Sequence, residues 1–285
     1  MGSILSIHKD IIRNIFRVYL NRDDRVLLLW AVNIRLKLSG ICGRAAARNH
    51  IEVLKWARSR GYEWSATDLV AATRGHLKLL QWAYSNGCSI NEYTCSAAAQ
   101  NGHLNILKWL RKSGCPWNEY VCSFAAQNGH LEVLRWARKK KCPWTGLACE
   151  KAAENGHLEI LKWAKENNLL QSSFISEIAS FNNHFKIVRW DFEENYYHDK
   201  SFEICRNFAR YGNLEALQWA REHDYPWDSF VCFIAADRGH IETLKWALEN
   251  GCPWTRCIYE FAVRERNQDL LLWFDVKGYP TKTNI

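Results

Sequence analysis

The chain has 285 residues, of which 48% are hydrophobic, and it carries a net charge of +8. No apolar run exceeds about seven residues, which is too short for a membrane-spanning helix or for the core of a secretion signal. Eleven cysteines, an odd number, favour reduced thiols in a cytosolic or nuclear compartment over a disulfide framework, and we expect a cytoplasmic protein. The net charge is modest, and nucleic-acid binding is not the expectation.

The N-terminal segment, residues 1–40, is the most basic part of the chain. Residues 1–48 contain nine Lys or Arg and three acidic residues, so they account for +6 of the net charge of +8. The opening Met-Gly-Ser-Ile-Leu-Ser fits the pattern for N-myristoylation, with Gly2 as the acceptor and Ser6 at the favoured position. An acyl chain and a basic patch together can hold a protein at a membrane, so a membrane tether through Gly2 is one hypothesis.

Asp10, Ile11, Ile15, Phe16 and Leu20 in the same segment match the spacing of a family motif, so the segment resembles an F-box. His8 stands where the family has a proline, and Arg25 interrupts the aspartate-leucine step after Asp24. The resemblance implies docking on the Skp subunit of a cullin ubiquitin ligase through the matching residues Asp10, Ile11, Ile15, Phe16 and Leu20. The alternative is that residues 24–30 are a degenerate repeat that caps the domain that follows, because Trp30 lies 26 residues before Trp56.

Residues 41–285 are built from one recurring unit of about 27 residues. The segment AAQNGHLNILKWLRKSGCPW (98–117) returns as AAQNGHLEVLRWARKKKCPW (125–144) and as AADRGHIETLKWALENGCPW (235–254). A fixed period in this range is typical of a solenoid, and we expect about nine repeats. One tryptophan per unit marks the register: Trp56, Trp82, Trp109, Trp136, Trp163, Trp190, Trp219, Trp246 and Trp273.

Each unit predicts two short helices. The first carries an alanine pair, such as Ala125-Ala126, and Asn-Gly supplies the left-handed residue that ends it. The second has the apolar spacing of one helix face, as in residues 157–164. Nine residues after each register tryptophan stands a residue suited to capping the first helix: Ser65, Asn91, Asn118, Thr145, Ser172, Asp199, Asp228 or Thr255.

One histidine per repeat precedes the second helix, and we predict that its role lies there rather than in a metal site. The histidines are His50, His76, His103, His130, His157, His184 and His240. Neighbouring helices pack about 8–10 Å apart, too far for two imidazoles to share a zinc ion with bonds of about 2 Å. The cysteines lack the short spacing of metal-binding knuckles, and no catalytic motif stands out. We therefore expect no enzymatic activity, no metal and no cofactor.

The repeated Ala-Ala-Gln-Asn-Gly-His-Leu-Glu-Val-Leu-Arg-Trp resembles the ankyrin repeat over roughly residues 41–279. Ankyrin units have about 33 residues, and the shorter units here lack the part that forms the projecting β-hairpin finger. The Thr-Pro-Leu-His tetrapeptide is also absent, with Tyr120-Val121-Cys122-Ser123 in its place. The Gly-Cys-Pro-Trp version is similar to ankyrin-like proteins of giant DNA viruses. The resemblance implies an all-α, ankyrin-like solenoid of helix-turn-helix repeats without long fingers.

The resemblance also implies a scaffold for protein-protein interaction. The residues at the start of the first helix vary between repeats. A binding face would produce this variation, and so would unconstrained drift. If it is a binding face, the candidate partner contacts are Tyr93, Glu119, Tyr120 and Phe230. Residues 191–210 break the period with a 29-residue step. They are either a merely degenerate repeat or an acidic-aromatic partner site made of Asp191, Glu193, Glu194, Tyr196 and Tyr197.

Two functions remain open on these residues. Viral proteins that join an F-box to ankyrin repeats resemble substrate adaptors, in which the box docks on Skp and the repeats hold the client. Such an adaptor would work in the host cytoplasm. A membrane-tethered scaffold is the alternative.

Basic residues before the register tryptophan often follow an acid by three residues, as Lys162 follows Glu159, and this pattern is typical of a solvated helix face rather than of a phosphate-binding track.

Overall fold

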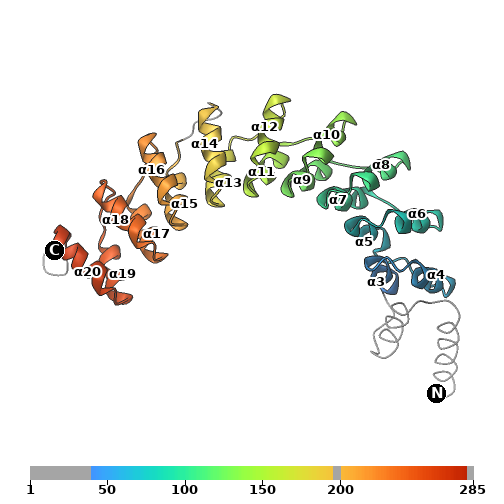
Figure 1. Cartoon of the computed structure of the whole chain (residues 1–285), viewed down its shortest axis with the longest axis horizontal. Helices are drawn as coiled ribbons and strands as arrows, with labels where there is room; N and C mark the ends of the chain where they lie inside the picture. The colour runs from blue at the N-terminus through green and yellow to red at the C-terminus, as the bar shows by residue number, and fades with distance from the viewer. Residues whose placement is uncertain (1–39, 195–199, 281–285) are drawn as a thin grey trace, which may run out of the picture. The chain divides into compact units, whose positions relative to one another are not determined.

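The computed structural model describes residues 40–194 and 200–280, and these residues form eighteen α-helices and no strand (Figure 1). The helices alternate between a first and a second helix, which gives nine pairs. The predicted all-α, ankyrin-like solenoid is confirmed for these residues. The pairs are α3 (Ile41–Ala47) and α4 (Ile51–Ser59), α5 (Thr67–Arg74) and α6 (Leu77–Ser85), α7 (Glu92–Gln100) and α8 (Leu104–Lys112), α9 (Tyr120–Gln127) and α10 (Leu131–Lys139), α11 (Gly146–Glu154) and α12 (Leu158–Glu166), α13 (Ile175–Phe181) and α14 (Phe185–Glu193), α15 (Phe202–Arg210) and α16 (Leu214–Glu222), α17 (Ser229–Asp237) and α18 (Ile241–Glu249), and α19 (Arg256–Arg264) and α20 (Gln268–Lys277).

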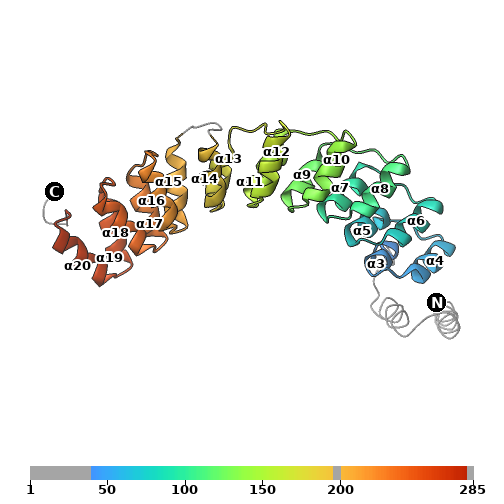
Figure 2. The same ribbon diagram turned by 45° about the horizontal axis from the view of Figure 1, so that its top comes forward.

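The contacts divide the chain into two compact units. Among the described residues, unit 1 contains 40–125 and 130–143, and unit 2 contains 126–129, 144–194 and 200–280. In unit 1, α5 packs between α3 and α7. In unit 2, the first helices α11, α13, α15, α17 and α19 form a continuous series, each packed on the next, and Figure 2 shows them side by side. The first helices of unit 2 therefore form one layer.

The residues proposed for an F-box, for a cap and for myristoylation lie outside the described residues. This applies to Gly2, to residues 24–30 and to the Skp contacts Asp10, Ile11, Ile15, Phe16 and Leu20. Within the described ranges, no helix combines the length and the apolarity that a bilayer span requires.

Glycines end both helices of a repeat in the same way. Gly102 follows α7 with φ of +71°, a left-handed conformation that glycine adopts without steric cost. The N–H of Gly102 donates to the carbonyl of Ala99, and the N–H of His103 donates to that of Ala98. These two bonds form a Schellman motif, and Gly114 repeats it after α8. The Asn-Gly turn predicted between the two helices is confirmed here.

The predicted caps of the first helices are confirmed in three repeats. The side chain of Asn91 accepts hydrogen bonds from the N–H groups of Tyr93 and Thr94, at 3.0 and 3.2 Å. Asn118 and Asp228 each accept one bond, at 3.1 Å, from the N–H two residues further on. Thr145 and Thr255 occupy the N-cap position without a side-chain hydrogen bond.

Three predicted caps differ from the structure. Ser65 adopts a left-handed φ of +50°, and α5 begins two residues later with Ala66 as its N-cap. The hydroxyl of Ser172 accepts a bond of 3.3 Å from the N–H of Phe174, as a cap would, but Phe174 itself stands at the N-cap position of α13. Asp199 lies outside the described residues, and Ser201 caps α15 by accepting a bond of 3.2 Å from the N–H of Glu203. The two extra residues of the 29-residue step therefore precede this cap, which a constant spacing could not anticipate.

In four of the described repeats the second tryptophan packs against the register tryptophan that follows it. Trp144 meets Trp163 edge-on with ring centroids 5.8 Å apart, and its indole N–H donates to the carbonyl of Leu169 at 2.8 Å. Trp117 and Trp136 repeat the contact at 5.8 Å in unit 1. Edge-to-face pairs at this separation stabilise a fold beyond the effect of their buried area. These tryptophans have a structural role, as the repeat pattern predicts.

Candidate interaction surface

The histidines connect neighbouring repeats instead of gathering around a metal. The Nε2–H of His130 donates to the carbonyl of Gln100, 30 residues earlier, at 3.1 Å. His103, His157, His184 and His240 make the same bond, at 3.0–3.1 Å, to a carbonyl 30 residues earlier. Each of these imidazoles also lies against the left-handed glycine of the preceding repeat. No group of three metal-ligating side chains occurs among residues 40–194 and 200–280. The histidines therefore fix the stacking of repeats.

The cysteines are also structural. Ten of the eleven are buried, and the exposed one is Cys257. Cys95 and Cys115 face each other with their Sγ atoms 3.4 Å apart, inside unit 1. Burial raises the pKa of the Cys149 thiol to about 11 and that of Cys205 to about 12. Because the thiolate is the reactive form, such thiols make poor nucleophiles at neutral pH.

The first helices carry exposed aromatic side chains, including three of the candidates chosen from the sequence. Tyr93 on α7 is 62% exposed, and Phe230 on α17 is 56% exposed. Tyr120 on α9 is also exposed, and its ring stacks on that of Phe124 with centroids 5.8 Å apart. Glu119 is half-buried. Tyr93, Tyr120 and Phe230 occupy the same position of the repeat, two residues after the N-cap. Tyr93 and Tyr120 belong to unit 1, and Phe230 belongs to unit 2.

The acidic-aromatic site predicted at the 29-residue step needs correction. Asp191 is only 4% exposed, and its carboxylate accepts a hydrogen bond from the hydroxyl of Ser176 inside unit 2. It cannot contact a partner, because it faces the core between α13 and α14. Glu193 and Glu194 are exposed but form ion pairs with Arg189 and Lys165. Tyr196 and Tyr197 lie outside the described residues.

Unit 2 carries further exposed aromatic residues that the sequence pattern did not single out. Together with Phe230 they lie on the first helices α13, α15 and α17 or at the ends of these helices, and we call these six residues the aromatic surface: Phe174, Phe181, Phe202, Tyr211, Phe230 and Phe233. Phe181 is 52% exposed and stands where earlier repeats have Gln100, Gln127 or Glu154. A column-by-column comparison of the repeats would have found it.

Two arginines hold the aromatic surface in place. Arg206 lies over the ring of Phe230, with its guanidinium carbon 5.0 Å from the ring centroid, and Arg210 lies over Phe181 at 5.2 Å. The hydroxyl of Tyr211 donates to the carbonyl of Phe181 at 2.8 Å. Cations above aromatic faces at these distances are attracted by the ring quadrupole. The aromatic rings are therefore partly ordered before any partner arrives.

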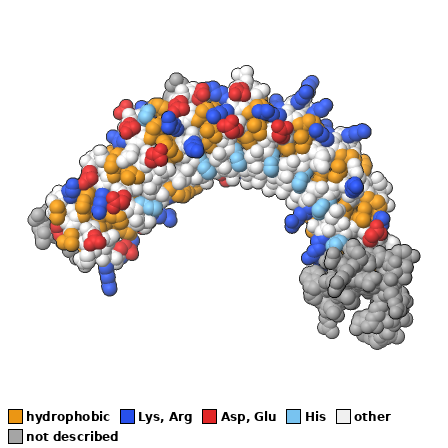
Figure 3. Space-filling view, viewed as in Figure 1, with side chains coloured by type: hydrophobic (Ala, Val, Ile, Leu, Met, Phe, Trp, Pro, Cys, Tyr) orange, Lys and Arg blue, Asp and Glu red, His pale blue; other side chains and the backbone are white. Residues whose placement is uncertain are grey.

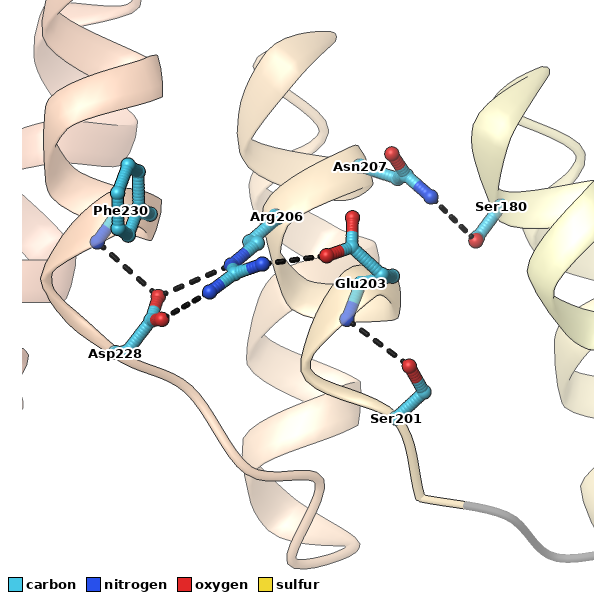
Figure 4. A network of polar contacts seen from close by, with 7 residues as sticks. All are labelled: Ser180, Ser201, Glu203, Arg206, Asn207, Asp228 and Phe230. Atoms are coloured by element: carbon cyan, nitrogen blue, oxygen red, sulfur yellow. Dashed lines mark hydrogen bonds and ion pairs between the residues drawn. The ribbon is translucent and has the colours of Figure 1, made fainter.

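Arg206 is the centre of a polar network that joins α15 to α17 (Figure 4). Its guanidinium binds both carboxylate oxygens of Asp228, the N-cap of α17, and it also pairs with Glu203 on its own helix. The arginine lowers the pKa of the Asp228 carboxyl, and the hydrogen bond from Phe230 N–H acts in the same direction. A bidentate pair of this kind fixes orientation as well as distance. It therefore sets where Phe230 stands relative to α15.

We expect Arg206→Gln to lower the free energy of unfolding by about 1 kcal/mol at pH 7, since a bidentate and half-buried pair exceeds an ordinary surface ion pair. The folded-state pKa of Asp228 lies below its unfolded value. Its contribution is therefore present above about pH 4 and is lost as the pH falls through the folded pKa. Urea unfolding at pH 7 and pH 3 measures this. Arg210→Gln, which lacks the bidentate pair, is the control, and equal losses in both variants at both pH values would contradict the assignment.

Comparisons with known proteins find similar chains among solved structures alone. No protein-family model matches the chain, and no curated protein matches it. Among solved structures, the chain is similar to the ankyrin repeat domain of human ASB11, with 16% identity and a TM-score of 0.49, over 66% of this chain and 99% of that one. It is also similar to the pentatricopeptide repeat protein PPR10 in complex with an 18-nucleotide psaJ RNA element, with 8% identity and a TM-score of 0.47. That likeness covers 86% of this chain but only 44% of PPR10, so the chain spans less than half of that protein.

Proposed function

We propose that this chain is a non-enzymatic scaffold that binds a protein partner through the aromatic surface of unit 2. The observation that supports this most directly is the exposure of large aromatic rings, 57% for Phe174 and 52% for Phe181 at the two ends of α13, and 47% for Phe202 on the neighbouring first helix α15. Exposed aromatic and arginine side chains are enriched in the centres of protein interfaces. Their burial by a partner removes apolar area from water, and the ordered rings lose little entropy on binding.

Charge favours a protein partner over a nucleic acid. Arg206, at the centre of the surface, is already neutralised by Asp228 and Glu203. In Figure 3 acidic and basic side chains are interspersed on the visible face of unit 2, without a continuous basic stripe. Binding of nucleic acid depends on several unpaired cations that neutralise phosphates. The RNA complex of PPR10 therefore does not transfer to this chain.

The test uses paired variants in an affinity-capture experiment from cells that express the chain. Phe181→Ser with Phe230→Ser removes two rings of the aromatic surface. Leu272→Ser with Val276→Ser removes two side chains on α20 that are 61% and 84% exposed, outside that surface. We expect partners identified by mass spectrometry to be lost from the first double variant and retained by the second. Retention by both, or capture that nuclease abolishes, would contradict the proposal.

The adaptor role is a further part of the proposal and depends on residues 1–40. The matching positions Asp10, Ile11, Ile15, Phe16 and Leu20 support docking on the Skp subunit of a cullin ligase, with the repeats holding the client. A pull-down of Skp with the full chain and with a chain lacking residues 1–40 tests it. Capture by the full chain alone supports an adaptor. If neither captures Skp, incorporation of myristate at Gly2 decides whether the segment is a membrane tether instead.

A further inference from the structure

Unit 2 contains a repeated binding arrangement for an imidazole ring. The rings of His157, His184 and His240 each fill the space above the left-handed glycine of the preceding repeat. A Cβ atom on Gly129, Gly156 or Gly212 would lie only 2.5–2.8 Å from the nearest ring atom. Each ring also donates its Nε2–H to the carbonyl two residues before that glycine, at 3.0–3.1 Å. Glycine and carbonyl together therefore form a socket that fits one imidazole.

In one repeat of unit 2 another side chain serves the carbonyl. Asn213 replaces the histidine there, and its amide donates to the side chain of Asn183 at 2.8 Å. The carbonyl of Phe181, which corresponds to the histidine acceptor, receives the hydroxyl of Tyr211 at 2.8 Å. The fold thus supplies a donor to this carbonyl even where the histidine is missing.

The last repeat lacks both the histidine and a substitute. Asn267 stands at the histidine position, and its side chain turns to its own helix, where it accepts a bond of 3.0 Å from the N–H of Leu270. A Cβ placed on Gly239 meets no atom within 4 Å. Among residues 200–280, no hydrogen bond is directed to the carbonyl of Asp237, the acceptor of this socket.

A cavity of about 490 Å³ opens at this place, between the α17–α18 turn and α19. Its walls include Gly239, Ile241 and the ring of Phe261, which is 9% exposed, and they supply apolar contacts for a flat ring. Asp237 and Glu265 also line the cavity. Arg264 lines it as well: its guanidinium carbon lies 5.4 Å from the ring centroid of Phe261, and it pairs with Glu265 at 3.0 Å and with Asp237 at 3.8 Å.

We propose that this cavity binds an imidazole ring supplied from outside the chain, as the histidine side chain of a partner protein. The ring lies above Gly239 and donates an N–H to the carbonyl of Asp237, as His240 does above Gly212 and to the carbonyl of Arg210. This proposal rests on the scaffold function for its biological meaning, because the partner delivers the histidine. The cavity itself binds imidazole whether or not the aromatic surface binds a partner.

The experiment titrates imidazole into the ¹⁵N-labelled full chain at pH 8, where the free ring is neutral, and follows the amide resonances of residues 237–241 by NMR. We expect a saturable shift with a dissociation constant on the order of millimolar, as suits so small a ligand. Gly239→Ala places a methyl group in the ring position and should weaken binding at least about tenfold, which corresponds to about 1.4 kcal/mol. Gly251→Ala is the matched control, because Gly251 also has a left-handed φ, of +88°, and open space around its Cβ position.

A second variant guards against misfolding of the first. Asn267→His supplies the ring from within the chain, so it should abolish imidazole binding and leave the rest of the spectrum intact. Absence of a saturable shift in the natural chain, or unchanged binding in Gly239→Ala or Asn267→His, would overturn the proposal. So would equal binding of p-cresol, since that would show an unspecific apolar site. Phe181→Ser with Phe230→Ser should bind imidazole normally, which separates this test from that of the scaffold function.

Discussion

Gly156→Ala is expected to lower the free energy of unfolding by about 2–5 kcal/mol. Its φ of +78° costs a residue with a Cβ about 1–2 kcal/mol. The new methyl group would also lie 2.8 Å from both Cε1 and Nδ1 of His184, and overpacking of this kind costs a further 1–3 kcal/mol or so. The ring cannot move away without losing its 3.0 Å bond to the carbonyl of Glu154.

Gly251→Ala is the control, because it introduces the same backbone strain without a contact between the new methyl group and a histidine ring. Gly251 has φ of +88° and no atom within 4 Å of the position that a Cβ would take, so Gly251→Ala should cost only the strain, about 1–2 kcal/mol. Urea denaturation monitored by tryptophan fluorescence compares the two. In a His184→Ala background, Gly156→Ala should cost no more than Gly251→Ala does. Equal losses in the natural background would show that the histidine does not fill a tight socket.

The repeat pattern predicts local structure well because local structure depends on neighbours in the chain. Helix pairs, the Asn-Gly turn and the cap at Asn91 all follow from residues within a few positions of one another. The histidines show the limit of such reasoning. Their place before the second helix is visible in the sequence, whereas the acceptor carbonyl lies 30 residues earlier and is found only once the repeats are stacked.

The candidate interaction surface was predicted in part, for a similar reason. The variable position that contains Tyr93, Tyr120 and Phe230 is exposed, as a binding face requires. Phe181 escaped notice because it lies at the other end of its helix, outside the variable stretch. The prediction that Asp191 contacts a partner is wrong. Its acidic neighbours in the sequence suggest an exposed position, and only the packing of α13 on α14 shows that the side chain is buried.

Asp191→Asn is expected to raise the stability of the protein at neutral pH by about 2–3 kcal/mol. Burial raises the pKa of Asp191 to about 6, against the smaller opposing effects of the Ser176 hydrogen bond and of Lys165. Two pKa units correspond to roughly 3 kcal/mol of cost for ionising this carboxyl in the folded state. Asparagine occupies nearly the same volume, remains a partner for the Ser176 hydroxyl and carries no charge to bury.

The pH dependence identifies the cause of this gain. Since the folded-state pKa lies above the unfolded value of about 3.9, the folded state of the natural chain binds more protons, and its stability falls as the pH rises from about 4 to 6. The advantage of Asp191→Asn should therefore be small at pH 4, grow through that window and stay constant above it. Urea unfolding at pH 4, 5, 6 and 8 measures the difference. A gain that is independent of pH would mean that ionisation of Asp191 is not its cause. A loss at pH 8 would mean that Asp191 is held ionised by its neighbours, and that its carboxylate ties α13 to α14 instead of opposing their packing.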